Sequence, residues 1–221
     1  MSLFNVWVSP TKAMVIVDTE VKAQDGRYFE GSKMLTLPHA NIVVAARGNT
    51  LFLSTLFSLL HVAQCTRCDD FEALMFSALK TTTDQLKTLE QTFAFKHSIY
   101  DNEVALVGYS HYYGGMHCVA YESRDETGFT AQEISDAYYA PWDESWGPAP
   151  TGFPTPGIAR AIASEQMADL LQMHPDKPFG GRLLLAELTR EDIKVCTGSP
   201  LTGRALNQPP GPRIWEAGAA L

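Results

Sequence analysis

The chain has 221 residues, of which 45% are hydrophobic and 19% are charged, and its formal net charge at pH 7 is -8. This length and composition suit one globular domain with a buried core. The excess of acidic residues excludes a general electrostatic attraction to nucleic acid or to an anionic membrane surface. We therefore expect neither as a partner.

Sequence signals for export, membrane insertion and cofactor binding are missing. Met1–Pro10 lacks the basic and apolar regions of a signal peptide, and no apolar run is long enough to span a membrane. The four cysteines do not form a secreted disulfide framework. No Walker loop and no H-E-x-x-H, G-x-S-x-G or G-x-G-x-x-G pattern occurs. We expect a cytoplasmic protein without a cofactor or a bound metal.

Short strands come first along the chain. The apolar runs Leu3–Val8 and Ala13–Val17 flank a Ser-Pro-Thr-Lys turn, which predicts a hairpin. After a polar stretch, Lys33–Leu37 and Ile42–Ala46 predict two further strands.

Two helices in succession follow these strands. The residues from Leu51 to Val62 predict a mostly apolar helix, and a second helix is predicted with Asp69 or Asp70 as its cap. Apolar residues then recur at helical spacing as far as Leu89. Since both helices follow a block of strands, we expect them to pack side by side on one face of a sheet.

Strands return in the second half. Glu103–Tyr109 and Met116–Tyr121 flank a Gly-Gly turn and predict a hairpin, and Phe129–Tyr139 is a weaker strand candidate. Pro141–Pro156 reads as a long loop rich in proline, glycine and aromatic residues.

The C-terminal third predicts one helix, two strands and a tail. Ile158–Met173 has the pattern of an amphipathic helix, and Arg182–Leu188 and Ile193–Cys196 predict strands. Thr197–Leu221 is rich in proline, glycine and small residues. We therefore divide the chain into a single domain at residues 1–196 and a C-terminal tail or arm at 197–221.

The order of the elements predicts the fold class. Segregated blocks of strands and helices favour α+β over alternating βαβ units. A four-layer αββα sandwich, with two antiparallel sheets between helix layers, fits this order.

The same order and several short segments resemble β-type subunits of the proteasome-like N-terminal-nucleophile hydrolases, over about Ser2–Cys196. Ser2–Val8 and Ala13–Thr19 resemble the start of a mature subunit, where the first residue is the nucleophile and an aspartate closes the second strand. Gly31–Leu35 is similar to the segment that carries the family's catalytic lysine, and Ile42–Gly48 is similar to the strand and turn that supply its oxyanion hole. Val104–Tyr109 is similar to a later central strand of the family. His174–Gly181 is similar to a helix-to-strand junction in which an aspartate precedes a Gly-Gly pair.

This resemblance implies a set of catalytic residues. Ser2 would be the nucleophile after removal of Met1, and its α-amine would be the general base. Lys33 and Asp18 would form the supporting pair. The full set implied is Ser2, Asp18, Lys33, the backbone N–H of Arg47 or Gly48 as oxyanion donor, and Asp176.

The implied activity is hydrolysis of a peptide or small amide through an ester-linked acyl-enzyme. A second hypothesis, from a different class, is a catalytically inactive scaffold or ring-forming subunit. Two observations favour it: Phe179 stands where the family has a serine before the Gly-Gly pair, and Tyr138–Ser145 holds no Ser-Gly motif. Whether the chain is an enzyme is thus open at this point.

Two further predictions concern assembly and the cysteines. The resemblance and the apolar first helix predict a homo-oligomer, assembled through the helices between Leu51 and Leu89 and through the tail. Cys65 and Cys68 form a C-x-x-C pair with His61 four residues earlier, which would place all three on one helix face. Such a set suits a metal or redox site, but a lone pair at a helix end favours buried structural cysteines.

Overall fold

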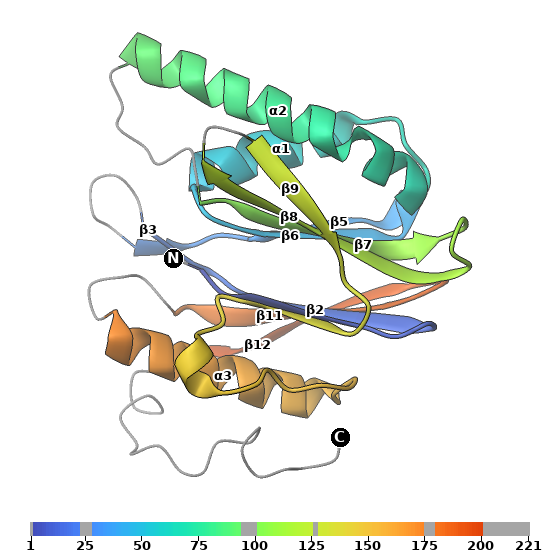
Figure 1. Ribbon diagram of the computed structural model, residues 1–221, viewed down its shortest axis with the longest axis vertical. Coiled ribbons are helices and arrows are strands. Elements are labelled where there is room, and N and C mark those ends of the chain that lie inside the picture. The colour runs from blue at the N-terminus through green and yellow to red at the C-terminus, as the bar shows by residue number, and fades with distance from the viewer. Residues whose placement is uncertain (1, 23–27, 94–100, 126–127, 175–179, 201–221) are drawn as a thin grey trace.

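The computed structural model describes residues 2–22, 28–93, 101–125, 128–174 and 180–200. Within these ranges, three α-helices and three antiparallel sheets form a fold of mixed α and β structure (Figure 1). The predicted mixture of helices with antiparallel sheets is confirmed at this level.

The first large sheet has the strand order β10-β1-β2-β11-β12. Its core is the predicted hairpin of β1 (Phe4–Val8) and β2 (Lys12–Asp18), which pair antiparallel. The other strands are β10 (Ala137–Ala140), β11 (Arg182–Thr189) and β12 (Ile193–Pro200). Every residue of β1 is buried, because the strand lies inside the sheet and is covered on both faces.

The second large sheet has the order β5-β6-β7-β8-β9. Its strands are β5 (Met34–Leu37), β6 (Ile42–Arg47), β7 (Glu103–Ser110), β8 (Gly115–Asp125) and β9 (Gly128–Glu133). A short 3-10 helix, η1 (Pro38–Ala40), joins β5 to β6. Successive side chains of a strand point to opposite faces, so β6 contributes to the apolar layers on both sides of this sheet.

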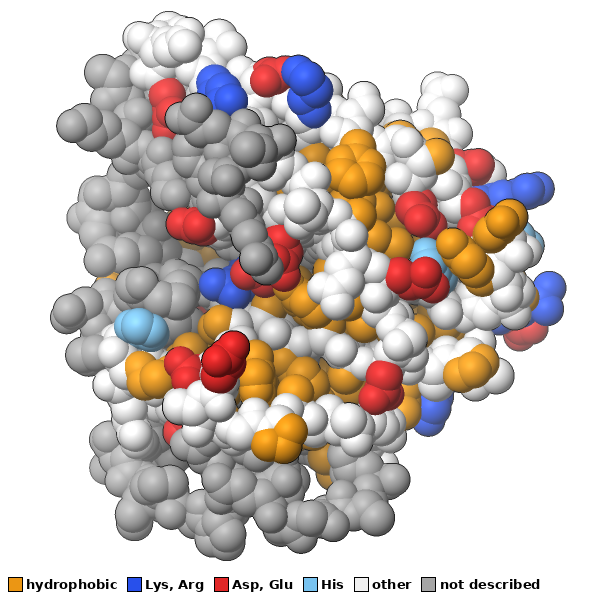
Figure 2. Space-filling view, viewed as in Figure 1, with side chains coloured by type: hydrophobic (Ala, Val, Ile, Leu, Met, Phe, Trp, Pro, Cys, Tyr) orange, Lys and Arg blue, Asp and Glu red, His pale blue; other side chains and the backbone are white. Residues whose placement is uncertain are grey.

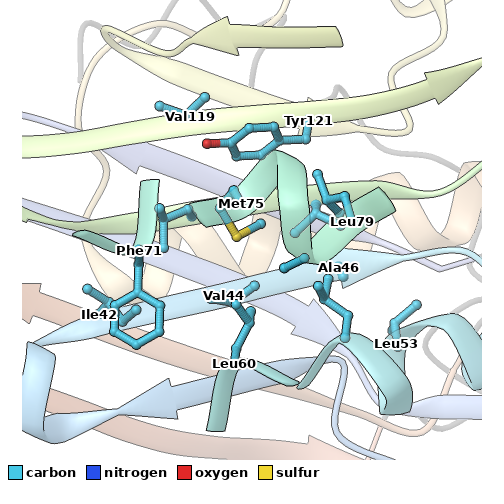
Figure 3. Close-up of a cluster of buried hydrophobic side chains, with 14 of the residues drawn as sticks. Ile42, Val44, Ala46, Leu53, Leu60, Phe71, Met75, Leu79, Val119 and Tyr121 are labelled. Atoms are coloured by element: carbon cyan, nitrogen blue, oxygen red, sulfur yellow. The ribbon is translucent and has the colours of Figure 1, made fainter. Parts of the chain in front are cut away.

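Helices α1 (Thr50–Val62) and α2 (Cys68–Phe93) cover the outer face of the second sheet (Figure 1). Asn49 caps α1, since its side chain accepts a hydrogen bond from the amide of Leu51 at 2.8 Å. Figure 3 shows side chains of both helices packed against those of β6 and β8, among them Leu60, Met75 and Val44. These two helices are thus held to the sheet by an apolar layer.

Helix α3 (Pro156–Met173) lies against the other large sheet, on the side away from α1 and α2 (Figure 1). Thr155 caps it, and Pro156 occupies the first turn, where its missing N–H costs no hydrogen bond. A buried hydrogen bond of 2.8 Å from the Asn5 side-chain amide to Gln166 joins β1 to α3. The apolar layer that β6 shares with β1, which includes Phe4, fills the space between the two large sheets.

Two small elements were not predicted from the sequence. Strands β3 (Glu20–Lys22) and β4 (Tyr28–Glu30) form a separate two-stranded sheet, although the sequence pattern predicted a polar connecting segment there. A second 3-10 helix, η2 (Glu144–Trp146), interrupts the long loop, and its Trp146 is buried against α3. Neither element has the apolar periodicity that marks a buried strand or helix.

The structure corrects three details of the prediction. The single strand expected at Phe129–Tyr139 is two strands, β9 and β10, which belong to different sheets. Asp69 does not cap α2, because the helix begins at Cys68 and the Asp69 carboxylate instead accepts hydrogen bonds from Ser110 and the His111 amide. His61, Cys65 and Cys68 do not share a helix face, since α1 ends at Val62 and α2 begins six residues later.

The last strand is longer than predicted. β12 includes Thr197–Pro200, the first four residues of the segment assigned to the tail. These residues are not apolar, but β11 offers them backbone partners as far as Arg182, which pairs with Pro200. Residues 201–221, the rest of the predicted tail, lie outside the described part of the chain.

Acidic side chains are scattered over the face of the molecule that Figure 2 shows. Hydrophobic side chains lie between them, and the described residues visible on this face form no continuous basic patch (Figure 2). No helix in the described ranges has both the length and the apolar character needed to cross a membrane. In the same part of the chain, no cluster of three or more His, Cys, Asp or Glu residues has a metal-binding arrangement.

Candidate active site

A cleft of about 230 Å³ opens where the ends of the two large sheets meet the small sheet and α1. Ser2, Lys33 and Gly48 all contribute to its wall. The other residues that line it are Glu20, Val21, Phe29, Gly31, Ser32, Thr50, Leu53, Ser54 and Phe57. Three of the six residues implied by the sequence resemblance therefore meet at one cavity.

A buried ion pair lies at this cleft. Asp18 ends β2 and Lys33 directly precedes β5, and the lysine Nζ lies 2.6 Å from the aspartate Oδ2. Their side chains are 0% and 4% exposed, respectively. The second carboxylate oxygen of Asp18 accepts a hydrogen bond of 2.8 Å from the backbone amide of Leu3. Both oxygens of the carboxylate are thereby used.

Burial governs the pKa of both partners. It is the largest influence on each group, and it raises the pKa of Asp18 and lowers the pKa of Lys33, because a desolvated charge is disfavoured. The attraction between the two charges, together with their hydrogen bond, opposes both shifts. The pKa values of the two groups therefore lie closer together than those of an exposed pair of the same residues.

The start of the chain is clamped beside this pair. The amide of Asp18 donates to the carbonyl of Leu3 at 3.2 Å, in addition to the bond from the Leu3 amide to the Asp18 carboxylate. These two bonds fix Leu3, and Ser2, the residue before it, is 6% exposed and faces the cleft. The predicted contact of Asp18 with Lys33 next to Ser2 is present, and the catalytic roles of the three stay predictions.

Of the two backbone donors expected for an oxyanion, only Gly48 lies at the cleft. The amide of Ala46 donates to the carbonyl of Lys33 at 2.9 Å, so the next amide, that of Arg47, faces the opposite neighbour, β7. The Arg47 side chain pairs with Glu103 at 2.9 Å and lines a second cavity. Gly48 has a φ of 130°, and a Cβ there would lie 2.2 Å from the Asn102 side-chain oxygen. Only glycine fits that conformation and approach.

The Gly-Gly pair supports the site from its other side. Gly181 has a φ of 73°, and a Cβ on it would lie 2.4 Å from the hydroxyl of Thr19. That hydroxyl accepts a hydrogen bond of 2.7 Å from the Arg182 amide, which ties the start of β11 to the residue after Asp18. The sequence singled out the glycines but not Thr19, since a threonine at a strand end is an ordinary β residue. Asp176 lies outside the described residues.

Sequence reasoning also missed Glu20 and Ser32 as lining residues of the cleft. Ser32 organises the entry to β5, because its hydroxyl and the Met34 backbone exchange hydrogen bonds. Nothing in the residue types distinguished either from a solvated turn residue. Their positions follow from the small sheet, which the sequence pattern did not reveal.

The second cavity, of about 530 Å³, is lined by acidic and aromatic residues on both large sheets. The hydroxyl of Tyr138, on β10, lies 2.7 Å from Glu122 and 3.1 Å from Glu103. Because Tyr138 belongs to one sheet and the two glutamates to the other, these contacts join the sheets. The residues that line this cavity are Arg47, Asp101, Glu103, Glu122, Ser123, Tyr138, Tyr139, Ala140, Pro141 and Trp142.

Comparisons with known proteins place the fold. No family model and no curated protein sequence matches the chain. Anbu from Yersinia bercovieri, an ancestral beta-subunit, is similar in structure, with a TM-score of 0.60 and 12% identity over 93% of this chain and 91% of that chain.

Two structures of Anbu from Hyphomicrobium sp. strain MC1 are similar as well. A mutant has a TM-score of 0.59 and 13% identity over 93% of this chain and 92% of its own. The other has a TM-score of 0.57 and 12% identity over 89% and 87%. At such identities the likeness concerns the fold alone.

These matches correct the resemblance drawn from the sequence. The three structures described above are Anbu proteins, and the assignment to proteasome β-type subunits is wrong. The short motifs that carried this resemblance lie at strand ends and glycine turns. Different families with the same fold share such features, so these motifs do not distinguish one family from another. The chain therefore shares its fold with Anbu structures.

Proposed function

We propose that this chain is an amide or peptide hydrolase that uses Ser2 as its nucleophile after Met1 has been removed. One observation carries the proposal: a buried Asp18–Lys33 pair, 2.6 Å apart, lies with Ser2 at a single cleft. Buried titratable pairs beside a nucleophile in a cleft are the usual setting for covalent catalysis.

The chemistry needs a base, because a serine hydroxyl is a weak nucleophile. The free α-amine of Ser2, whose ordinary pKa is about 7.7–8.0, would take the hydroxyl proton. The positive charge of Lys33 would lower that pKa, and Asp18 would hold Lys33 in place while fixing Leu3 through its amide. Nucleophile and base would thus belong to one clamped residue.

The reaction would then follow acyl transfer. The Ser2 oxygen attacks the amide carbonyl, the α-amine accepts the hydroxyl proton, and the Gly48 N–H stabilises the oxyanion. The amine product leaves with that proton and an ester to Ser2 remains. A water molecule, deprotonated by the same α-amine, cleaves the ester and restores Ser2. No cofactor or metal takes part in these steps.

Intact-mass spectrometry and one substitution test this proposal. We expect the mass of a chain without Met1, and we expect Ser2→Ala to lower kcat/KM for a peptidyl amide by at least about a thousandfold. The matched control is Ser54→Ala, because Ser54 lines the same cleft but its hydroxyl donates to its own helix. A retained Met1, or equal activity of the Ser2→Ala variant and the wild type, would exclude the mechanism.

The alternative is a catalytically inactive scaffold. Two departures from the resemblance favour it: Phe179 stands where a serine would precede the Gly-Gly pair, and Tyr138–Ser145 holds no Ser-Gly motif. Under this alternative the Asp18–Lys33 pair only joins the sheet ends. A chain that lacks Met1 yet reacts with no serine-directed electrophile would support it.

Further proposals concern architecture, assembly and location. We propose that residues 1–196, together with the end of β12, form one αββα unit with the rest of 197–221 as an appendage, and that the chain assembles with copies of itself. The description of the Yersinia protein as a beta-subunit supports assembly. The four cysteines are unpaired in the structure, which supports a reducing compartment such as the cytoplasm. Light scattering during gel filtration tests assembly, and a monomer mass would refute it.

A further inference from the structure

The cleft beside Ser2 has an uneven distribution of charge. Among the described residues that line it, Glu20 is the single carboxylate, whereas much of the remaining wall is apolar. The apolar lining residues are Val21, Phe29, Leu53 and Phe57. Such a wall suits the aliphatic part of a substrate side chain, and the carboxylate suits a charged end group.

The charge of the Glu20 carboxylate is only partly compensated within the site, because Lys33 attracts it and Asp18 repels it. Within the described part of the chain, no hydrogen bond or ion pair holds it. The nearby cation, Lys33, is already bound to Asp18. Two carboxylates and one ammonium leave this group of three with one excess negative charge when all are ionised.

Backbone geometry fixes where this charge lies. Glu20 is the first residue of β3, and its amide donates to the carbonyl of Gly180 at 3.2 Å. A Cβ at Gly180 would lie 3.1 Å from both carboxylate oxygens, so the missing side chain there leaves room for the Glu20 carboxylate. The Gly-Gly pair thus supports Glu20 through Gly180 as well as Thr19 through Gly181.

We propose that Glu20 makes the cleft select substrates with a cationic side chain, an arginine or a lysine, next to the amide bond that Ser2 attacks. This inference rests on the proposed function and specifies its substrate class. A volume of 230 Å³ equals the liquid volume of about eight water molecules, so an arginine or lysine side chain fits within it. The net charge of -8 also draws cationic substrates toward the protein.

The first experiment measures kcat/KM for three amides that share one leaving group and differ in the acyl residue: arginine, norleucine and glutamate. We expect the arginine amide to exceed the norleucine amide by at least about tenfold, as is typical of a hydrogen-bonded charge. Glu20→Gln should remove most of this ratio, and Glu20→Lys should favour the glutamate amide over the arginine amide.

The matched control is Glu30→Gln. Glu30 lies opposite Glu20 on β4, carries the same charge and is absent from the lining of the cleft. The arginine-to-norleucine ratio should stay unchanged in this variant. Equal rates for the arginine and norleucine amides in the wild type would overturn the inference, and so would a ratio that Glu20→Gln and Glu30→Gln reduce alike.

A binding experiment separates this inference from the proposed function. Calorimetry of argininamide with the Ser2→Ala variant needs no catalysis, and we expect binding that Glu20→Gln weakens about tenfold or more. If the wild type cleaves no amide but argininamide binds in this way, the proposed hydrolase fails and the cation site stands. If amides are cleaved and argininamide does not bind, the hydrolase stands and the cation site is refuted.

Discussion

Two cavities of this molecule contain a carboxylate–cation pair, and the two pairs differ in burial and in chemistry. At the Ser2 cleft, Asp18 and Lys33 are almost completely buried and 2.6 Å apart. At the second cavity, Arg47 and Glu103 are 2.9 Å apart and are 13% and 22% exposed. The first pair has a serine beside it at the cleft, and the second has the phenol of Tyr138.

The difference shows why a charged cavity is not by itself an active site. Arginine stays protonated in proteins, whereas burial lowers the pKa of Lys33. Burial, and then the charge of Glu103, raise the pKa of Tyr138, which keeps this phenol a neutral hydrogen-bond donor. The second cavity therefore joins the two sheets, and the first combines a serine with a buried pair whose pKa values are shifted by desolvation.

Breaking the buried pair should have the largest effect on stability. Lys33→Met leaves the Asp18 carboxylate buried without its cation, so we expect the free energy of unfolding to fall by about 3–5 kcal/mol. The double variant Asp18→Asn with Lys33→Met should recover most of this loss, because no charge is then buried alone. Urea denaturation of the single and double variants measures both effects. A double variant less stable than Lys33→Met would contradict this account.

The pH dependence of the unfolding free energy tests the direction of the pKa shifts of Lys33 and Asp18. The folded-state pKa of Lys33 is below its ordinary 10.5. Between these two pKa values the unfolded chain binds more protons than the folded chain, so stability rises with pH in that range. The folded-state pKa of Asp18 is above 3.8, so stability falls as pH rises from 3.8 to that pKa. The double variant should flatten the curve in both windows, and unchanged slopes would show that other groups cause them.

The turn at Gly48 should show the next largest effect. Gly48→Ala places a Cβ 2.2 Å from the Asn102 oxygen at a φ of 130°, so we expect a loss of about 2–3 kcal/mol in unfolding free energy. Its hydrolytic activity should fall as well, because the amide moves away from the cleft. Gly114→Ala is the control: its φ is 69°, nothing lies within 4 Å of its Cβ, and we expect a loss of about 1 kcal/mol with activity retained. Equal losses would show that contact with Asn102 is unimportant.

The second cavity should show the smallest effect. Glu103→Gln removes the charge that faces Arg47 and keeps the side-chain shape, so we expect thermal unfolding to report a loss of about 1–2 kcal/mol. Amide hydrolysis should be unaffected, since Glu103 lies outside the Ser2 cleft. Asp84→Asn, which breaks the exposed pair with Lys80 on α2, should produce no measurable change. A Glu103→Gln variant that loses hydrolysis while folded would show that the two cavities are coupled.

Much of the fold could be predicted from local pattern. The runs Leu3–Val8 and Ile42–Ala46 are continuously apolar because their strands are buried on both faces, and this composition is visible without tertiary knowledge. Helices α1 and α3 were also predictable, since their apolar spacing and polar flanking residues are local signals. The placement of Asp18 and Lys33 at one site came from family resemblance alone, because residues 15 apart carry no local sign of contact.

What the sequence by itself determined is therefore most of the buried strands and the helices, together with the residue types available at the cleft. The tertiary structure decided the rest: it divided Phe129–Tyr139 between two sheets, extended β12 to Pro200, turned Arg47 away from the cleft and brought Glu20 to it. Each of these outcomes depends on which segments of the chain, distant in the sequence, pack against one another. Strand pairing and desolvation both arise from contacts between residues that are far apart in the sequence. The types of the polar residues alone indicate neither of them.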